Sequence, residues 1–377
     1  MFKRGSSYFH YLKDRKQYVL VNGEVSELLD ISKGVPQGSI LGPILFLIYI
    51  NDLPIATELF TLLFADDTSF LISGRDLNDV IRKLNVELKK VCDWFRSNEM
   101  SLHPDKTKFM IFNKNENSIP WNDINIELNF NNDNEYDLNN ISRLKYVNSQ
   151  SQIPAIKFLG IFIDPNLNFK YHIDYIHKKI SSSLYMINRA KHFLTQDALK
   201  LLFNSFIQSH LLYCLPIYSC TSKGNLKKLE NIQKKALRIV TNSNYNAHTA
   251  EKFRKLEILP LEQQIMYSKL LFMYDYINQK LPKSFNSVWK KNHEIYNDNP
   301  RNTRRANEND FHIPFMRCKA IEILPVYHFQ KLWNENCNND LLTYNQPRKL
   351  FIKSLKTYLM INVETYCTRA NCQQCNN

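Results

Sequence analysis

Several features are scarce or missing in this sequence of 377 residues, and each scarcity excludes a class of protein. The longest apolar stretch, Ile40 to Ile50, has eleven residues, whereas a membrane-spanning helix needs about 20. The N-terminus lacks the apolar core of a secretory signal, and eight scattered cysteines are too few for a disulfide scaffold in a chain of this length. We therefore expect a soluble protein of the nucleus or cytoplasm, neither secreted nor membrane-inserted.

Acidic residues are also in deficit. The chain has 49 Lys and Arg against 36 Asp and Glu, a formal charge of +13, while 44% hydrophobic and 23% charged residues are typical of a globular protein. Between residues 169 and 240, twelve basic residues face three acidic ones, a local balance of +9. This excess favours an acidic partner, nucleic acid before a membrane, although a solvated helix face explains any single lysine there equally well.

Glycine is scarce, and three of its eight copies, Gly34, Gly38 and Gly42, fall within nine residues. Glycine is used where the backbone takes a positive φ or approaches another group closely, so the segment Gly34–Pro43 predicts a specialised loop. A buried helix is expected to start after Pro43. An ordinary turn at the start of a helix is the alternative, and the lack of Gly-Lys-Ser/Thr excludes a Walker phosphate loop.

Two adjacent carboxylates, Asp66 and Asp67, stand between two short runs rich in β-branched and aromatic residues, which predicts a strand, a turn and a strand. Two unit charges 4 Å apart repel by about 4 kcal/mol at an effective dielectric near 20. Bound Mg²⁺ removes this repulsion, because it prefers carboxylate oxygens together with substrate phosphates. The pair is therefore a candidate two-metal site for phosphoryl transfer, and a solvated hairpin turn is the alternative.

Hydrophobic periodicity assigns the remaining elements. We expect a helix that Asp76 caps and that ends near Asn98, with its apolar stripe packed on the hairpin, so that Leu84→Asp unfolds this region. Residues 113–150 are rich in asparagine and predict a long surface loop. The other expected elements are weak strands near Ile124–Leu128 and Arg143–Val147, a strand over Ile156–Ile163, three helical stripes between His172 and Val240, and a mostly helical segment over 246–377.

Ordered motifs of this chain resemble the reverse transcriptases of non-LTR retrotransposons, and the jockey-like group among them. The motifs are Gly34–Pro43, Tyr49–Pro54, Phe64–Asp67, Leu102–Lys108 and Phe158–Ile161. The resemblance extends over roughly residues 7 to 290 and is weaker in the helical region. An organellar intron maturase or a telomerase-like relative fits less well, because the pair Phe-Ala-Asp-Asp and Ile-Asn-Asp-Leu-Pro is closer to mobile elements.

The resemblance implies an α+β fold. A partial right-hand polymerase palm, made of an antiparallel sheet with helices, would be followed by a helical thumb and a mostly helical C-terminal region. The implied divisions are a partial palm over 1–112, the Asn-rich surface loop over 113–150, a primer-grip hairpin over 151–170, a helical thumb over 171–245, and a C-terminal region with a Cys-containing tail over 246–377.

The resemblance also implies an activity: RNA-directed DNA polymerase, a nucleotidyltransferase that copies an RNA template by adding dNTPs to the 3′ hydroxyl of a DNA primer through two-metal phosphoryl transfer. Asp66 and, less directly, Asp67 match the palm aspartates that hold Mg²⁺, or Mn²⁺ in its place. Lys106 matches the lysine that assists as pyrophosphate leaves. The other matched residues are Pro36, Gln37, Gly38, Ser39, Phe64 and Ala65 around the nucleotide and template base, and Phe158, Leu159 and Gly160 in the primer grip.

Two features depart from the family pattern, the smaller being His103, which stands where the family usually has asparagine. The first catalytic aspartate of the family lies on a palm strand before the segment that resembles Tyr8–Val19, and neither that strand nor the fingers has a counterpart here. Since two-metal catalysis needs carboxylates from both strands, we expect an N-terminally truncated polymerase that is inactive, or nearly so, on its own. The alternative function is a catalytically dead remnant that still binds nucleic acid.

The last cysteines of the chain, Cys367, Cys372 and Cys375, make up part of a zinc site. A fourth ligand would have to come from Cys337 or His328 by folding back. We therefore favour a tail with free thiols over a zinc site.

Overall fold

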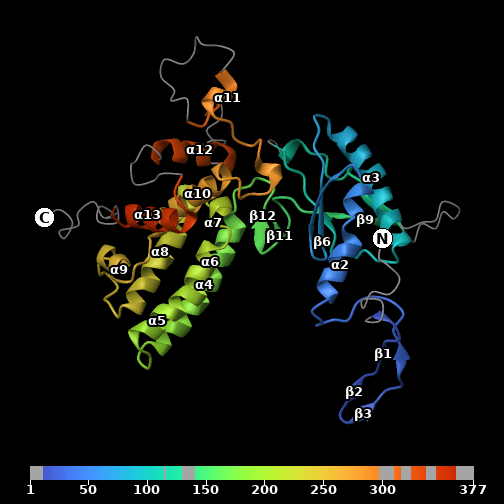
Figure 1. Ribbon diagram of the computed structural model, residues 1–377, viewed down its shortest axis with the longest axis horizontal. Helices are drawn as coiled ribbons and strands as arrows, with labels where there is room; N and C mark the ends of the chain where they lie inside the picture. The colour runs from blue at the N-terminus through green and yellow to red at the C-terminus, as the bar shows by residue number, and fades with distance from the viewer. Residues whose placement is uncertain are drawn as a thin grey trace. The chain divides into compact units, whose positions relative to one another are not determined.

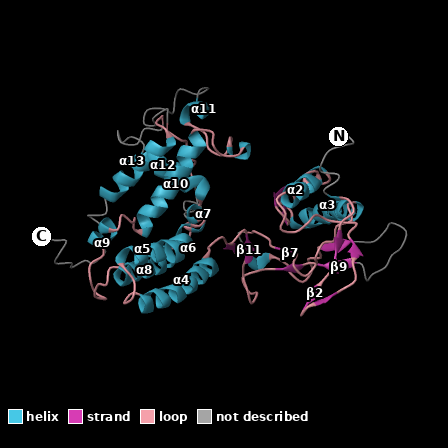
Figure 2. Cartoon of the chain, turned by 60° about the horizontal axis from the view of Figure 1, so that its bottom comes forward, coloured by secondary structure: helices cyan, strands magenta, loops and turns pink. Residues whose placement is uncertain are grey.

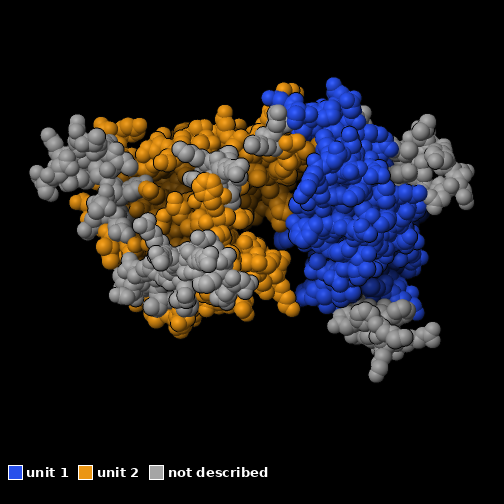
Figure 3. All heavy atoms as spheres, turned by 90° about the horizontal axis from the view of Figure 1, so that it is seen from above, with its two compact units in different colours: residues 1–109, 117–146 blue, residues 110–116, 147–377 orange. Residues whose placement is uncertain are grey.

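The computed structural model describes residues 12–113, 116–129, 141–296, 310–315, 324–336 and 345–361 (Figure 1). The chain forms two compact units, which we call unit 1 (residues 1–109 and 117–146) and unit 2 (residues 110–116 and 147–377) (Figure 3). Most strands belong to unit 1, whereas helices dominate unit 2 (Figure 2). This mixture of helices and small sheets agrees with the expected α+β class.

Unit 1 is built from short strands that pair two by two and from two longer helices. Its antiparallel pairs are β1 (Lys16–Gln17) with β4 (Leu29–Asp30), β2 (Leu20–Val21) with β3 (Glu24–Val25), β5 (Phe60–Phe64) with β6 (Asp67–Leu71), and β8 (Glu127–Asn129) with β9 (Ile141–Arg143). Its helices are α2 (Gly42–Ile50), the 3₁₀ turn η1 (Leu53–Ile55) and α3 (Leu77–Ser97). A further 3₁₀ turn, η2 (Glu116–Ser118), crosses the boundary between the units.

One ladder of unit 1 differs from the expected antiparallel sheet. β7 (Lys108–Phe109) and β10 (Lys145–Tyr146) pair in parallel. Parallel neighbours need a connection of a dozen or more residues, and the long segment between these strands provides it. The expected weak strands in the Asn-rich segment are confirmed as β8, β9 and β10.

Helix α3 begins as its sequence predicts. The Asp76 side chain accepts a hydrogen bond of 2.9 Å from the backbone N–H of Asp79, which caps the first turn. Further along, Val91 and Phe95 are buried in one cluster that also takes in side chains of α2, η1 and the β5–β6 hairpin (Figure 1). The expected packing of this helix on the hairpin is therefore confirmed.

The position of Leu84 differs from the expectation. Leu84 is only half-buried and does not belong to the cluster that joins α3 to the hairpin. The residues of α3 that touch this core lie two turns later, because the hairpin contacts the C-terminal half of the helix. Val91 is therefore a sharper position than Leu84 for testing this packing.

Unit 2 begins with one hairpin and continues as helices. The hairpin consists of β11 (Ile156–Phe158) and β12 (Ile161–Ile163), so the single strand expected over these residues is wrong. The chain reverses at Leu159 and Gly160, whose φ angles are +43° and +88°. The helices are α4 (Lys170–Ala190), α5 (Gln196–Phe203), the π-helical turn η4 (Asn204–Gln208), α6 (Ser209–Leu212), α7 (Leu215–Tyr218), α8 (Lys223–Val240), α9 (Ala250–Lys255), α10 (Leu261–Ile277), the 3₁₀ turn η5 (Lys283–Phe285), α11 (Asn292–Tyr296), α12 (Pro325–Asn336) and α13 (Arg348–Ile361).

The core of unit 2 consists of two apolar clusters. The first is formed mainly by α4, α5 and α8, and it contains buried residues of all three predicted helical stripes. The second joins α10, α12 and α13, where the rings of Tyr274 and Phe351 stack with centroids 4.2 Å apart. Among the helices in the described ranges, none is both long and apolar enough to cross a membrane.

Candidate active site

The turn of the β5–β6 hairpin carries the Asp pair. Phe64 lies opposite Asp67 in the ladder, so Ala65 and Asp66 form a two-residue turn. Ala65 has a φ of +51°, a left-handed conformation that costs a residue with a Cβ roughly 1 kcal/mol. Backbone strain of this kind is often found at functional positions.

Both carboxylates of the pair, Asp66 and Asp67, are exposed to solvent. Water therefore offsets their mutual repulsion, and a cation is not needed to explain why they are adjacent. The expectation that apolar strands make this pair costly without a metal ion is wrong in this respect. The exposed position fits a solvated turn and an open site equally well.

The donor chemistry of the pair suits Mg²⁺ or Mn²⁺, because both ions prefer hard carboxylate oxygens. Asp66 and Asp67 can supply such oxygens from one turn. Within the part of the chain that the structure describes, no group of three or more His, Cys, Asp or Glu is arranged to hold a metal ion. The two aspartates thus fit as part of a metal site and do not complete one by themselves.

The glycine-rich loop is fixed by its own hydrogen bonds. The Ser39 hydroxyl donates to the Pro36 carbonyl at 2.7 Å and accepts from the Gly42 N–H at 3.0 Å. A Cβ on Gly42 would lie 2.8 Å from both the Pro36 carbonyl oxygen and Ser39 Oγ, so no larger residue fits there. Gly38 has a φ of +77° and open space around it, and it is exposed together with Gln37. The loop therefore presents backbone to solvent in a fixed shape.

Lys106 lies in the turn that precedes β7, and its side chain is exposed. No ion pair to it occurs among the described residues. Its neighbour Asp105 binds Lys145 at 3.0 Å, and this hydrogen bond lowers the pKa of the Asp105 carboxyl. The amino group of Lys106 is thus available to an anionic ligand.

Sequence reasoning missed Glu87, a buried carboxylate of α3. It accepts hydrogen bonds from the Thr57 hydroxyl at 2.9 Å and the Glu58 N–H at 2.7 Å, and it pairs with Lys90. The hydrogen bond from Lys90 is the main cause that lowers the pKa of Glu87. Glu87 therefore ties the segment before β5 to α3, and its signal in the sequence was an acid on the apolar stripe next to Leu88.

The predicted primer-grip residues Phe158, Leu159 and Gly160 form the end of β11 and the turn of the β11–β12 hairpin. The Tyr213 hydroxyl donates a hydrogen bond to the Leu159 carbonyl. A Cβ on Gly160 would lie 3.1 Å from the Tyr213 ring. This turn thus needs glycine both for its positive φ and for the approach of the ring.

Asp164 is a second buried carboxylate whose role the sequence did not reveal beyond a turn. It accepts backbone N–H groups of Asn166 at 3.2 Å, Asn168 at 3.0 Å and Phe169 at 2.6 Å. These bonds hold the loop between β12 and α4. Asp164 therefore fixes the hairpin against the first helix of unit 2.

Unit 1 brings several of the sequence-predicted residues onto one scaffold. The cluster of Ile50, Leu53, Val91 and Phe95 joins the helix that follows the glycine-rich loop, the Asp hairpin and α3. Lys106 follows Leu102, which packs against the same cluster. The predicted primer-grip residues belong to unit 2.

The proposed zinc ligands are largely outside the described residues. Cys337, Cys367, Cys372 and Cys375 all lie there. His328 is described, in α12, with its Nδ1 3.5 Å from the Lys269 amino group, and burial lowers the pKa of His328 to about 4.

Comparison with known proteins adds sequence evidence to this geometry. Residues 6–163 match the family described as reverse transcriptase (RNA-dependent DNA polymerase). The chain is 24% identical over 267 residues to the RNA-directed DNA polymerase from mobile element jockey of Drosophila melanogaster, covering 68% of this chain and 27% of that protein. It is 27% identical, with the same coverage, to the probable RNA-directed DNA polymerase from transposon BS of the same organism, and 20% identical over 266 residues to that from transposon X-element, again covering 68% and 27%. The chain thus spans about a quarter of the length of the curated relatives it matches.

Proposed function

We propose that this chain belongs to the reverse transcriptase family and takes part in RNA-directed DNA synthesis, because residues 6–163 match that family and the chain is similar to the RNA-directed DNA polymerases of the mobile element jockey and the transposon BS. The reaction would be nucleotidyl transfer: the 3′ hydroxyl of a DNA primer attacks the α-phosphorus of a dNTP opposite an RNA template, and pyrophosphate leaves. The family generally uses divalent metal ions.

One observation carries the proposal. Asp66 and Asp67 stand exposed at the turn of a hairpin that a single apolar cluster joins to the helix behind the glycine-rich loop. A carboxylate pair and a backbone-presenting loop on one scaffold are two of the parts that nucleotidyl transfer uses, because the carboxylates can bind cations and the loop can approach the substrate closely.

Each residue of unit 1 then has a role. Asp66 and Asp67 would hold Mg²⁺, or Mn²⁺ in its place, and when bound the ion would neutralise charge that develops on the phosphates. The loop residues Gln37, Gly38 and Ser39, with Pro36, would contact the incoming nucleotide and the template base. Phe64 and Ala65 would shape the floor beside the Asp pair. Lys106 would stabilise the departing pyrophosphate through its exposed amino group.

In unit 2 the β11–β12 hairpin would hold the primer end, with Phe158, Leu159 and Gly160 in contact with it. The basic helices that follow would act as a thumb and contact the phosphates of the nucleic acid. Unit 1 would then correspond to a palm. We place this work in the nucleus or cytoplasm, where RNA template and dNTPs are found.

Primer extension on an RNA template tests the proposal. Any Mg²⁺-dependent synthesis by the chain should be lost in the Asp66→Ala/Asp67→Ala double variant and retained in Asp79→Ala, which removes an exposed acid from α3. Synthesis of this kind would overturn the expectation that the chain is inactive, or nearly so, on its own. Synthesis that survives in the double variant would contradict the assignment of the pair. No synthesis by the unaltered chain, with salt-sensitive binding of an RNA–DNA hybrid retained, would indicate a polymerase fragment that binds its substrate and does not copy it.

A further inference from the structure

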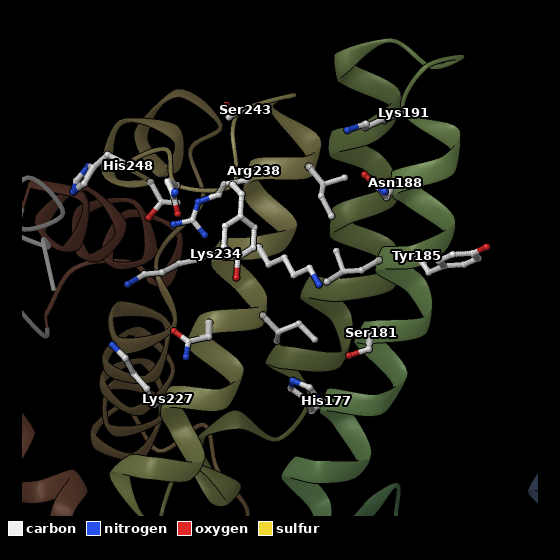
Figure 4. A pocket seen from close by; sticks show the side chains of 18 residues that line it. His177, Ser181, Tyr185, Asn188, Lys191, Lys227, Lys234, Arg238, Ser243 and His248 are labelled. Carbon is white, nitrogen blue, oxygen red and sulfur yellow. The ribbon is translucent and has the colours of Figure 1, made fainter. Parts of the chain in front are cut away.

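A pocket of about 900 Å³ opens in unit 2 between α4, α8 and the polar loop that follows α8 (Figure 4). Figure 4 shows His177, Ser181 and Asn188 along α4 on one side, with Arg238 and further side chains of α8 and the following loop on the other. Its volume lies within the range of about 300–1,000 Å³ that is usual for ligand pockets. Most of its lining lies in the segment 171–245 that the resemblance assigns to a thumb, and none of the residues assigned to the metal, nucleotide or primer-grip sites lines it.

The lining of this pocket is strongly basic. Its charged residues are Lys191, Lys227, Lys234, Lys235 and Arg238, and no Asp or Glu lines it. Glu230, just outside, pairs with Lys227 and Lys234 and leaves the rest of the charge in place. Within the described ranges, Lys191 and Lys235 make no ion pair. A cluster of this kind binds phosphate groups.

The pocket also has features that phosphate does not need. Leu184 and Ile232, both buried, and Ile239 form an apolar part of the lining. Tyr245, on the loop after α8, lines the pocket although its side chain is 77% exposed. An exposed aromatic ring beside an apolar surface is a platform on which a nucleic-acid base stacks.

Side-chain amides complete the set. Asn188, Asn231 and Asn246 line the pocket, and each amide offers donors and an acceptor to the edge of an unpaired base. The loop that carries Asn246 is tied to α8, because Arg238 Nε donates to the Ala247 carbonyl at 2.9 Å. Basic, aromatic and amide groups therefore face one space.

A double helix cannot use this combination. Its bases are paired and stacked, so that only its phosphates would reach the basic side chains, and the apolar surface and the amides would stay unoccupied. An unpaired nucleotide can place its base on Tyr245 and its flanking phosphates on Lys191 and Lys235.

We propose that this pocket binds single-stranded nucleic acid, with an unpaired base against Tyr245 and the flanking phosphates on Lys191 and Lys235. The proposal rests on the proposed function in one respect, since it takes nucleic acid as the partner. It goes beyond that function because it adds a site for an unpaired strand to a chain whose other sites are assigned to a primer–template duplex.

Fluorescence anisotropy with the full chain tests the site. The probes are a 12-nucleotide single strand of oligouridine, the same length of oligodeoxythymidine, and an RNA–DNA hybrid of equal length. We expect Tyr245→Ala to weaken single-strand binding about tenfold, the size of one lost base stack, and to change hybrid binding less than twofold. Tyr245→Phe retains the aromatic ring and should bind the single strands as tightly as the parent chain does.

Salt dependence tests the basic residues. Since each phosphate contact on a single strand contributes about 0.7 to the slope of log K against log salt, Lys191→Ala/Lys235→Ala should lower that slope by about 1.4. Lys353→Ala/Lys356→Ala, which removes two exposed lysines of α13 outside the pocket, is the matched charge control, and Phe193→Ala, an exposed aromatic residue, is the matched ring control. Circular dichroism verifies that each variant is folded.

Two results would overturn the proposal: equal loss of single-strand and hybrid binding in Tyr245→Ala, which indicates a duplex grip, or no loss in either. Preference for RNA or for DNA among the two single strands leaves it standing. Primer extension separates this site from the proposed function. If the chain binds single strands through Tyr245 and does not extend primers, the pocket proposal stands without polymerase activity. If it extends primers and Tyr245→Ala leaves single-strand binding unchanged, the polymerase proposal stands and the pocket proposal is wrong.

Discussion

Unit 1 and unit 2 differ in the size of the apolar clusters that hold their elements together. In unit 2 one continuous cluster contains residues of α4, α5 and α8, and a second holds α10, α12 and α13 together. In unit 1 the cluster around the Asp hairpin has only Ile50, Leu53, Val91 and Phe95 as fully buried members. Phe60 and Phe64 on the hairpin stay largely exposed.

Helix α2 of unit 1 also differs from the helices of unit 2 in how much of its apolar surface is buried. It is apolar on every side, a pattern typical of buried helices, yet Ile44, Leu47 and Ile48 are each about half exposed, so the expectation of a buried helix after Pro43 is wrong. The helices α4 and α8, by comparison, are amphipathic and bury their stripes. The Asp hairpin of unit 1 therefore rests on a small cluster, whereas other buried residues of this unit, among them Leu88, Ile124 and Leu128, lie outside that cluster. Single substitutions in the small cluster should have large effects.

The two units share one device, a buried carboxylate that fixes a loop. Glu87 accepts hydrogen bonds from Thr57, Glu58 and Lys90 in unit 1. Asp164 accepts three backbone N–H groups in unit 2. In each case the carboxylate positions the segment next to a predicted site, before β5 in one unit and before α4 in the other.

The largest effect is expected from Val91→Asp in unit 1. It buries an unpaired charge in the small cluster and should cost more than about 4 kcal/mol, enough to unfold unit 1 while unit 2 stays folded. Hydrogen exchange, followed peptide by peptide, measures this. Val86→Asp, at an exposed position of the same helix, is the control, and Leu84→Asp should have an intermediate effect. Simultaneous loss of protection in both units would break the comparison.

Asp164→Ala should come next, at about 3 kcal/mol, because it leaves the N–H groups of Asn166, Asn168 and Phe169 without their acceptor. Hydrogen exchange at the start of α4 reports the effect. Asp197→Ala, an exposed acid in the first turn of α5, controls for removal of a charge. A loss below about 0.5 kcal/mol would contradict the anchoring role.

Glu87→Gln should destabilise unit 1 by about 1 kcal/mol at pH 7, since the amide cannot pair with Lys90 as a carboxylate does. The folded-state pKa of Glu87 lies below its ordinary value of 4.5, so the carboxylate stabilises the fold above that pH and the contribution disappears as the pH falls through the folded pKa. Denaturant unfolding, measured from pH 7 to pH 3, should show that the difference in free energy of unfolding between Glu87→Gln and the parent becomes smaller as the pH falls. A difference independent of pH would show that packing, not charge, is lost.

An effect similar in size to that of Glu87→Gln is expected at the hairpin turn of unit 2. Gly160→Ala forces a Cβ into a residue with a φ of +88° and against the Tyr213 ring, and should cost about 1 kcal/mol. Gly224→Ala, in the first turn of α8, places its Cβ 4.0 Å from the nearest atom and is expected to be neutral or slightly stabilising. Hydrogen exchange at β11 and β12 distinguishes the two, and equal effects would remove the special role of this turn.

Much of unit 2 was predictable from sequence because its helices follow a regular apolar period that its core then buries. The cap of Asp76 on α3 and the Asp hairpin were predictable for the same reason, since both depend on neighbours in sequence. The division of Ile156–Ile163 into two strands was not predictable from periodicity, because Leu159 gives no sign of its positive φ, and only the resemblance implied a hairpin over 151–170.

The surroundings of the Asp pair show where prediction from sequence stops. Apolar neighbours in sequence suggested that Asp66 and Asp67 are enclosed. In the structure Phe60 and Phe64 are themselves largely exposed, and both carboxylates are exposed to solvent. A strand has two faces, and an apolar residue on one of them says nothing of what lies beyond the turn.

The sequence by itself determined the elements: the glycine-rich loop, the hairpin, the capped helix, and the basic helices, since period, φ preference and capping act over a few residues. The tertiary structure decided which carboxylates are buried as anchors, which are exposed, and which basic side chains share a pocket with Tyr245. Those outcomes depend on partners far apart in the chain, as Glu87 with Thr57 and Tyr213 with Leu159, and no local preference encodes them.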